Sequence, residues 1–331
     1  MMRCAVVGAG AWGTALADRL ARNAHAVRLW AYEPDVVESV NTRHQNRFLP
    51  DVELPSDIVA STTMADVVRG ADIVVMVAPS HVTRAIAEAA QPHISRDATV
   101  VVASKGIEQH SLCRMSQVVE DVFGTGPAVA LSGPSFAAEV ARGLPTAVVA
   151  ACADPEPAQL VQRVFHAPAF RVYTQHDVIG AELGGAVKNV MAVATGICEG
   201  LDLGFNARAA LITRGLAEMM RLGLALGADA ETFAGLAGLG DLVLTCTGSL
   251  SRNRALGVEI GRGKTLDETL AGRQTVAEGV ITTRSTRALA ERLDVKMPIV
   301  QSVYDVLFEG RAPRDAMTDL MARDPRAERD D

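Results

Sequence analysis

The 331-residue sequence has few aromatic residues, few cysteines and no long apolar run. Phe, Trp and Tyr make up only 4% of the residues, so a packed core must be built mainly from Ala, Val and Leu. The five cysteines lie far apart without a Cys-x-x-Cys pair, which excludes a disulfide framework and indicates reduced thiols in a cytosolic protein. No apolar run is long enough to span a membrane, and glycines 8, 10 and 13 interrupt the N-terminal stretch that could resemble a signal peptide. We therefore expect a cytoplasmic protein without a membrane span.

An excess of basic residues is also lacking. Lys and Arg number 32 against 39 Asp and Glu, which gives a net charge of −7 with His neutral. Broad nucleic-acid binding needs a basic surface, so we expect no nucleic-acid partner, whereas a small anionic substrate needs only a local basic pocket. The seven His form neither an HExxH motif nor a Cys/His cluster, and we predict no metal site.

Hydrophobic residues make up 49% of the chain, and its length corresponds to about two domains. Continuous Val, Ala and Ile runs alternate with helical patterns over residues 1–177, which is typical of strands buried on both faces of a parallel sheet. We predict a Rossmann-like doubly wound α/β domain there, followed by an all-helical domain over 178–331 with a frayed charged tail at 323–331. Strands are predicted at Cys4–Gly8, Val27–Ala31, Ile73–Val77, Thr99–Ala103, Ala128–Leu131, Ala147–Ala151 and Phe170–Tyr173.

A GxGxxG motif follows the first predicted strand and opens a helix. Gly8 suits the tight turn, Gly10 lets the backbone approach a pyrophosphate, and Gly13 lets the helix pack against the strand. The free N–H groups at the start of the helix favour phosphates. The motif predicts a site for NAD or NADP; the alternative is a glycine-rich turn in an unrelated α/β domain.

An acidic residue, Glu33, ends the second predicted strand about 20 positions after the motif. A carboxylate at this place accepts hydrogen bonds from the ribose hydroxyls of NAD and repels the extra phosphate of NADP. The alternative is a solvated carboxylate on a loop.

Two further segments follow predicted strands at the edge where open α/β sheets bind ligands. Lys105 could contact an anionic group there, although a lysine in this position is usually just solvated. Ser135 follows Gly133 in a second strand-to-helix turn. Its hydroxyl could cap the next helix or face a substrate.

The predicted helix over 180–200 is apolar on nearly all sides, and Lys188 and Asn189 stand out within it. A buried ammonium needs partners or a lowered pKa, and both conditions suit a lysine that transfers protons. The alternative is a lysine whose stem reaches the surface.

A glycine-rich, apolar stretch surrounds Asp241, which needs a buried partner; Lys188 is the natural candidate. Ser251 reads as the N-cap of a helix whose first turn carries Arg252 and Asn253. A helix N-terminus with an arginine is a phosphate-binding arrangement, and the alternative is an ordinary capped helix with a surface arginine pair.

Together these segments resemble the NAD(P)-dependent glycerol-3-phosphate dehydrogenases of the bacterial type. The resemblance covers about residues 2–320. It is carried by the motifs GAGAWGTALA at 8–17, SKG at 104–106, SGPSFA at 132–137, LGGAVKNV at 183–190, NARAALITRGLAE at 206–218, GLGDLVLTCT at 238–247, SRN at 251–253 and VAE at 276–278.

The resemblance implies reversible reduction of dihydroxyacetone phosphate to sn-glycerol 3-phosphate for phospholipid synthesis. It implies that Lys188 exchanges a proton with the substrate oxygen, that Lys105 and Asp241 flank the carbonyl, and that Thr245 supports them. Substrate contacts would also come from Gly133, Ser135, Ser251, Arg252 and Asn253. Cofactor contacts would come from Trp12, Lys105, Ala137, Arg252, Val276 and Glu278.

Two positions depart from the family pattern. Ala11 stands where many members have Ser, which removes one side-chain contact to the cofactor. Tyr32 stands where many members have a basic residue that would bind the NADP phosphate; it could still stack on adenine, so both NAD and NADP stay open. Related enzymes are commonly dimers, and we expect a homodimer.

Two other functions fit parts of the pattern. A β-hydroxyacid-type dehydrogenase acting on a carboxylate substrate would share the Rossmann domain, the helical domain and the Lys-Asn pair. A non-catalytic dinucleotide sensor is disfavoured, because it has no need of Lys105, Lys188 and Asp241 together.

Overall fold

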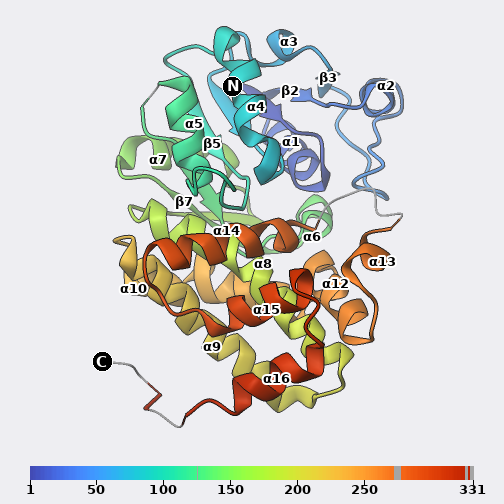
Figure 1. Cartoon of the computed structure of the whole chain (residues 1–331). Helices are drawn as coiled ribbons and strands as arrows, with labels where there is room; N and C mark the ends of the chain where they lie inside the picture. The colour runs from blue at the N-terminus through green and yellow to red at the C-terminus, as the bar shows by residue number, and fades with distance from the viewer. Residues whose placement is uncertain (125, 272–276, 325–326, 329–331) are drawn as a thin grey trace.

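The structure, a computed structural model, describes residues 1–124, 126–271, 277–324 and 327–328. Every described strand lies within residues 3–175, and the described elements from residue 178 onward are helical (Figure 1). A mostly parallel sheet flanked by helices therefore precedes an all-helical region, as the sequence predicts. The expectation of a frayed tail falls partly on residues 325–326 and 329–331, which lie outside the described residues.

The eight strands form one sheet in the order β3-β2-β1-β4-β5-β6-β7-β8. They are β1 (Arg3–Val7), β2 (Ala26–Trp30), β3 (Val59–Ser61), β4 (Ile73–Met76), β5 (Thr99–Val102), β6 (Val129–Ser132), β7 (Thr146–Ala151) and β8 (Phe170–Gln175). The sequence predicts all of them except β3. That edge strand has only three residues, which is too short for a hydrophobic pattern to stand out.

The direction of β7 corrects the expectation of a parallel sheet. The strands from β3 to β6 run parallel, but β7 runs antiparallel to β6, and β8 is parallel to β7. The chain leaves β6, passes through the short helix α6 (Ala137–Ala141) and re-enters the sheet in the opposite direction. The last four residues of β7 are all buried, as in a parallel strand, so its composition does not reveal its direction.

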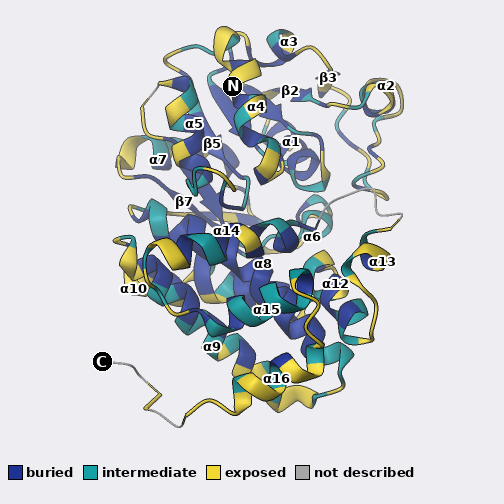
Figure 2. Cartoon of the chain, viewed as in Figure 1, coloured by how far each residue is buried: buried dark blue, intermediate teal, exposed yellow. Residues whose placement is uncertain are grey.

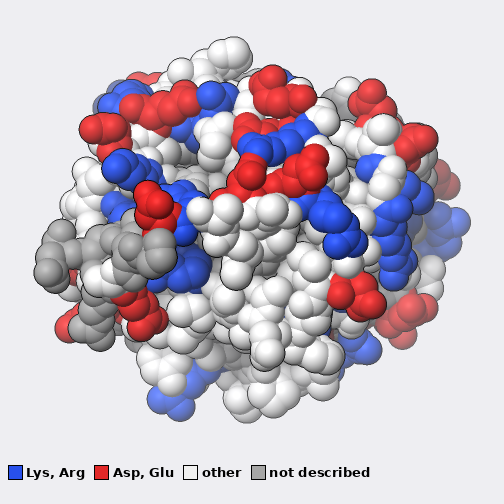
Figure 3. Space-filling model, turned by 60° about the horizontal axis from the view of Figure 1, so that its bottom comes forward, with Lys and Arg blue, Asp and Glu red and all other residues white. Residues whose placement is uncertain are grey.

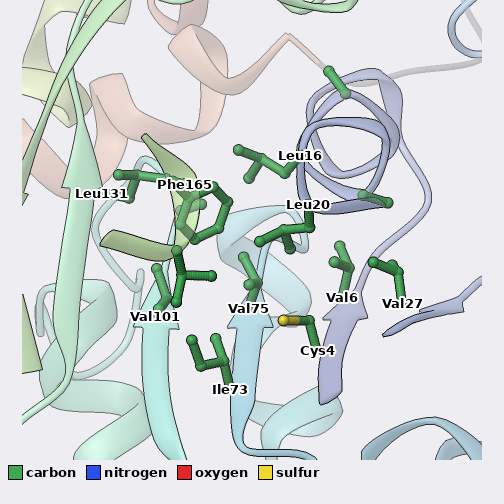
Figure 4. Close-up of a cluster of buried hydrophobic side chains, with 14 of the residues drawn as sticks. Cys4, Val6, Leu16, Leu20, Val27, Ile73, Val75, Val101, Leu131 and Phe165 are labelled. Carbon is green, nitrogen blue, oxygen red and sulfur yellow. The ribbon is translucent and has the colours of Figure 1, made fainter. Parts of the chain in front are cut away.

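Helices cover both faces of the sheet. Alternate residues of β1 enter different hydrophobic clusters: Val6 lies in one cluster and Val7 in the other. Figure 4 shows the helix residues Leu16, Leu20 and Phe165 gathered over the first of these faces. The helices of this part are α1 (Ala11–Arg22), α2 (Pro34–Arg43), α3 (Met64–Val68), α4 (Thr83–Ala90), α5 (Met115–Phe123), α6 and α7 (Pro155–Phe165), with short 3-10 turns η1 (Ser80–Val82) and η2 (Gln91–His93).

One long helix, α8 (Val178–Gly200), forms the centre of the helical region (Figure 2). It is buried without interruption over residues 180–198, because helices pack around it on several sides. The remaining helices are α9 (Gly204–Ala225), α10 (Ala230–Ala234), α11 (Asp241–Thr247), α12 (Arg252–Gly261), α13 (Leu266–Leu270), α14 (Glu278–Arg292), α15 (Pro298–Phe308) and α16 (Pro313–Met321). Within the described residues, no helix combines the length and apolar character that crossing a bilayer requires.

The glycine-rich segment before Asp241 contains a π-helical turn, η3 (Leu236–Gly240). The amide of Gly240 donates to the carbonyl oxygen of Gly235, five residues earlier, at 3.1 Å. The turn leads directly into α11, whose first residue is Asp241. Such turns are rare in proteins and frequently occur at functional sites.

The turn from β1 to α1 explains the three motif glycines. Gly8 has φ +125°, a backbone conformation that residues with a side chain rarely adopt. A methyl carbon on Gly13 would lie 1.8 Å from the carbonyl oxygen of Gly8, so only glycine allows the helix to approach the turn. A methyl carbon on Gly10 would have no described atom within 4 Å, so this glycine borders open space.

These geometries predict opposite effects of alanine at two motif positions. Gly13→Ala forces backbone atoms apart and should lower the free energy of unfolding by about 1–3 kcal/mol. Gly10→Ala should leave the stability unchanged, because Gly10 has an ordinary φ of −66° and free space beside it. Urea unfolding of both variants measures the difference, and equal stabilities would contradict the turn geometry.

Candidate active site

The candidate site lies where the parallel strands end and α8 packs against the sheet. Gly8 follows β1, Lys105 lies just beyond β5, and Gly133 follows β6, so all three lie at the same edge. The helix α8 contacts β6 there. A methyl carbon on Gly185 of α8 would lie 3.4 Å from the side chain of Lys105. The site therefore combines residues of the sheet and of the helical region.

The carboxylate of Asp241 holds two lysines, one on each oxygen. Oδ1 accepts a short hydrogen bond from Nζ of Lys188, and Oδ2 accepts one from Nζ of Lys105 at 2.7 Å. Nζ of Lys188 also donates to the hydroxyl of Thr245 at 2.9 Å. The predicted pairing of Lys188 with Asp241 is confirmed. Lys188 is only 7% exposed, which rules out the alternative that its stem carries the amine to the surface.

Burial changes the acidity of Lys188. The pKa of Lys188 is lowered from 10.5 to about 8, chiefly because burial removes its solvation; the attraction of Asp241 opposes this shift, and the positive charge of Lys105 adds to it. An amine with this pKa exchanges protons readily near neutral pH. Asp241 itself is fully buried, so the pair of lysines is its compensation.

A carbonyl oxygen joins Lys105 to the turn after β6. The carbonyl of Gly133 accepts a hydrogen bond from Nζ of Lys105 at 3.0 Å and another from the hydroxyl of Ser135 at 2.9 Å. Ser135 does not cap the next helix, because the N-cap position of α6 is Phe136. Of the two roles considered for Ser135, the capping role is therefore wrong.

The start of α12 lies close to α8. The hydroxyl of Ser251 accepts a hydrogen bond from the amide of Arg254 at 3.2 Å, which confirms the predicted N-cap. Arg252 and Asn253 are the first two residues of the helix. Asn189 is the residue after Lys188, and its side-chain oxygen accepts a hydrogen bond from the side-chain nitrogen of Asn253 at 2.9 Å. The side-chain oxygen of Asn253 accepts one from the backbone amide of Gly279 at 2.9 Å, and the two bonds together fix the orientation of the Asn253 amide.

The β1–α1 turn has the features that a dinucleotide requires. The helix α1 begins with Ala11 and Trp12 and has no acidic residue in its first turn. The indole Nε1 of Trp12 is buried and has no hydrogen-bond partner within the described part of the chain. The backbone N–H groups at the start of α1 and the open space beside Gly10 fit a bound pyrophosphate.

The other positions implied for the cofactor lie in different places. Tyr32 is 79% exposed just after β2, and Glu33 is the N-cap residue of α2. Ala137 is the first residue of α6. Val276 lies outside the described residues.

Glu278 contacts Ser80, a residue that the sequence does not single out. The carboxylate of Glu278, at the start of α14, accepts from the amide of Ser80 at 3.0 Å and from its hydroxyl at 2.7 Å. Burial raises the pKa of Glu278. Ser80 follows β4 at the same edge of the sheet as Lys105, and this position after a strand is the one feature of the sequence that could have pointed to it.

The sequence also did not predict a contact between the start of α5 and α8. The buried carboxylate of Glu182 accepts from the amide of Ser116 at 2.7 Å, from its hydroxyl at 2.6 Å and from the guanidinium of Arg114 at 2.5 Å. No feature of the sequence near Glu182 predicts these partners, which lie 66 and 68 residues away along the chain. Within the described residues, no group of three or more His, Cys, Asp or Glu side chains is placed to hold a metal ion.

Comparison with known proteins agrees with this arrangement over nearly the whole chain. Residues 3–158 match the family model described as NAD-dependent glycerol-3-phosphate dehydrogenase N-terminus, and residues 177–318 match the model of its C-terminus. The chain is 52% identical to glycerol-3-phosphate dehydrogenase [NAD(P)+] of Syntrophotalea carbinolica, over 99% of this chain and 100% of that protein. It is 54% identical to the enzyme of that name from Geobacter metallireducens, over 98% of both chains.

A crystal structure agrees as well. Glycerol-3-phosphate dehydrogenase from Coxiella burnetii superposes with a TM-score of 0.94 at 40% identity, and the match covers 97% of this chain and 99% of that one. The sequence and structural matches extend across both the sheet and the helical region. The chain therefore belongs to the NAD-dependent glycerol-3-phosphate dehydrogenase family.

Proposed function

We propose that the protein reversibly reduces dihydroxyacetone phosphate to sn-glycerol 3-phosphate with NADH or NADPH. The observation that carries this proposal is the buried Lys188–Asp241–Lys105 cluster at the ligand edge of the sheet. Membership of the family favours a phosphorylated ketone over the carboxylate substrate of other β-hydroxyacid-type dehydrogenases. The paired lysines also favour an enzyme over a sensor that only binds a dinucleotide.

The phosphate of the substrate would bind at the start of α12. Arg252 supplies a cation in the first turn, and the free N–H groups of the helix favour an anion. Ser251 and Asn253 complete this end of the site. Gly133, Ser135 and Lys105 would hold the other end of the substrate near the sheet, where their hydrogen bonds meet at one carbonyl oxygen. Binding at both ends would orient the carbonyl toward Lys188.

The nicotinamide cofactor, when bound, supplies the hydride that adds to the carbonyl carbon. Lys188, as an ammonium, would break one N–H bond and give that proton to the carbonyl oxygen, so the ketone becomes an alcohol. Asp241 and Thr245 hold the amine in place during the transfer. Two lysines beside one carboxylate leave an excess of one positive charge, which stabilises the negative charge developing on the substrate oxygen.

The cofactor would lie along the glycine turn, with its pyrophosphate against Gly8, Gly10 and Gly13. Ala11, Trp12 and Ala137 would border it, as would Lys105, Arg252, Val276 and Glu278. Glu33 favours the ribose hydroxyls of NAD, and exposed Tyr32 offers a stacking surface to adenine. Position 32 carries no basic side chain to bind the additional phosphate of NADP, so this position does not favour NADP over NAD, and either cofactor fits the proposal.

We further propose a division into domains at 177/178, since the strands end at Gln175 and α8 begins at Val178. The product would supply phospholipid synthesis in the cytoplasm. On the face in Figure 3, Lys and Arg are interspersed with Asp and Glu, and uncharged residues occupy much of the centre and lower part. Such a face suits a homodimer better than a nucleic acid.

A steady-state assay tests the reaction. We expect NADH or NADPH to be consumed with dihydroxyacetone phosphate and not with ketones that carry a carboxylate in place of the phosphate. Comparison of the two cofactors gives the preference. Cofactor binding without turnover of any ketone would contradict the enzymatic function and favour a sensor.

Replacing the proposed proton donor should abolish most of the turnover. Lys188→Ala is expected to lower kcat at least about 100-fold, and the exposed Lys296→Ala serves as control with unchanged kcat. In the reducing direction, activity should fall as the pH rises through about 8, because the ammonium form of Lys188 is lost. Near-normal turnover in folded Lys188→Ala would overturn the assignment.

The phosphate site predicts a different kinetic effect. Arg252→Ala should raise KM for dihydroxyacetone phosphate by about 10- to 100-fold, as expected for loss of a charge-assisted hydrogen bond. Arg262→Ala, an exposed arginine just after the other end of α12, is the matched control. If Arg252→Ala left both KM and kcat unchanged, the phosphate would have to bind elsewhere.

A further inference from the structure

The π-helical turn η3 presses directly against α8 at Gly184. A methyl carbon on Gly184 would lie 2.3 Å from the carbonyl oxygen of Ala237 and 2.9 Å from its carbonyl carbon. Both atoms belong to the backbone, so they cannot move aside as the end of a flexible side chain could. The absence of a side chain at Gly184 therefore sets how close the turn comes to the helix.

The other side of the turn is equally close to its neighbour. A methyl carbon on Gly238 would lie 2.2 Å from the carbonyl oxygen of Phe233, at the end of α10. The turn is thus held between α10 and α8, and neither side leaves room for it to shift. Its chain continues straight into Asp241, the first residue of α11.

Gly184 and Lys188 are four residues apart and lie on the same face of α8. The turn meets this face at Gly184, and Asp241 meets it at Lys188. The distance between η3 and α8 consequently decides whether the carboxylate of Asp241 reaches the amine of Lys188. Thr245, one helical turn after Asp241 on α11, contacts the same amine.

We propose that Gly184 and Gly238 are positioning residues, which seat the π-helical turn so that Asp241 engages Lys188 in the catalytic arrangement. They touch neither the amine nor the carboxylate and act through the backbone of residues 236–240. This role deepens the proposed function, since its kinetic consequence rests on Lys188 as the proton donor.

Alanine at position 184 would disturb this seat without removing a reacting group. To relieve the contact at 2.3 Å, the turn would have to rise by about 1 Å, a misplacement that can cost up to about 100-fold in rate. Asp241 would move with it and release Lys188. The charged and titratable groups facing that amine are Asp241, Lys105 and the thiol of Cys246. Loss of the Asp241 attraction would leave burial and Lys105 to lower the pKa of Lys188 below about 8.

The experiment compares Gly184→Ala with Gly200→Ala in the full-length enzyme. A methyl carbon on Gly200 would lie 2.4 Å from the carbonyl oxygen of Val258, a similar clash at the far end of the same helix. Thermal melting measures stability, cofactor titration gives Kd, and steady-state assays give kcat and KM for dihydroxyacetone phosphate. Amine labelling at a series of pH values, quantified by mass spectrometry, gives the pKa of Lys188 without requiring activity.

The melting temperatures of both variants should fall by similar amounts, and the Kd of both for the cofactor should stay unchanged. Only Gly184→Ala should lower kcat, by about 10- to 100-fold, and lower the pKa of Lys188. If Gly184→Ala does not fold, Gly238→Ala displaces the same turn from the α10 side and is judged by the same measurements.

Two results would overturn the proposal: a folded turn variant with normal kcat and Lys188 pKa, or equal changes in Gly200→Ala. Failure of the proposed function looks different. In that case Lys188→Ala would keep its turnover, while the labelling experiment would still report whether the turn positions Asp241.

Discussion

A single carboxylate shared by two lysines is the interaction on which the site depends. Asp241 is fully buried, and such a charge is costly in an apolar interior unless it is paired. Its partners come from opposite sides, Lys105 from the loop after β5 and Lys188 from α8. The loop at the sheet edge, the helix α8 and the start of α11 therefore meet around one buried ion cluster. Removing either lysine would leave the carboxylate undercompensated, so the same interaction serves stability and chemistry.

Much of the fold can be predicted from the pattern of hydrophobic residues and from the glycines and polar residues that separate the hydrophobic runs. The apolar runs predict seven of the eight strands, and the uniformly apolar stretch near Lys188 predicts the buried helix α8. The direction of β7 was not predictable, because buried strands have the same composition whether they run parallel or antiparallel. The π-helical turn was not predictable either, since Gly235–Gly240 has no periodicity and its conformation depends on α8 and α10 packing around it.

The parts of the site that the sequence predicts are those that depend on neighbouring residues in the chain or on buried charges that need a partner. The pairing of Lys188 with Asp241 followed from two isolated charges in apolar surroundings, and the cap formed by Ser251 followed from its place before a helix. The partners of Glu278 and Glu182 could not be found this way. Ser80 lies 198 residues from Glu278, and neither sequence segment carries a mark of the other. Only the three-dimensional packing of α14 against η1 and of α8 against α5 brings these groups together.

The uninterrupted burial of α8 limits how this protein can change in length. A helix turns about 100° with each residue. One residue inserted between Glu182 and Lys188 would swing the amine away from Asp241 into packed side chains. The two anchor points, at Ser116 and at Asp241, could then no longer be satisfied together. Surface loops can gain or lose residues during evolution, whereas this segment of the chain must keep its length.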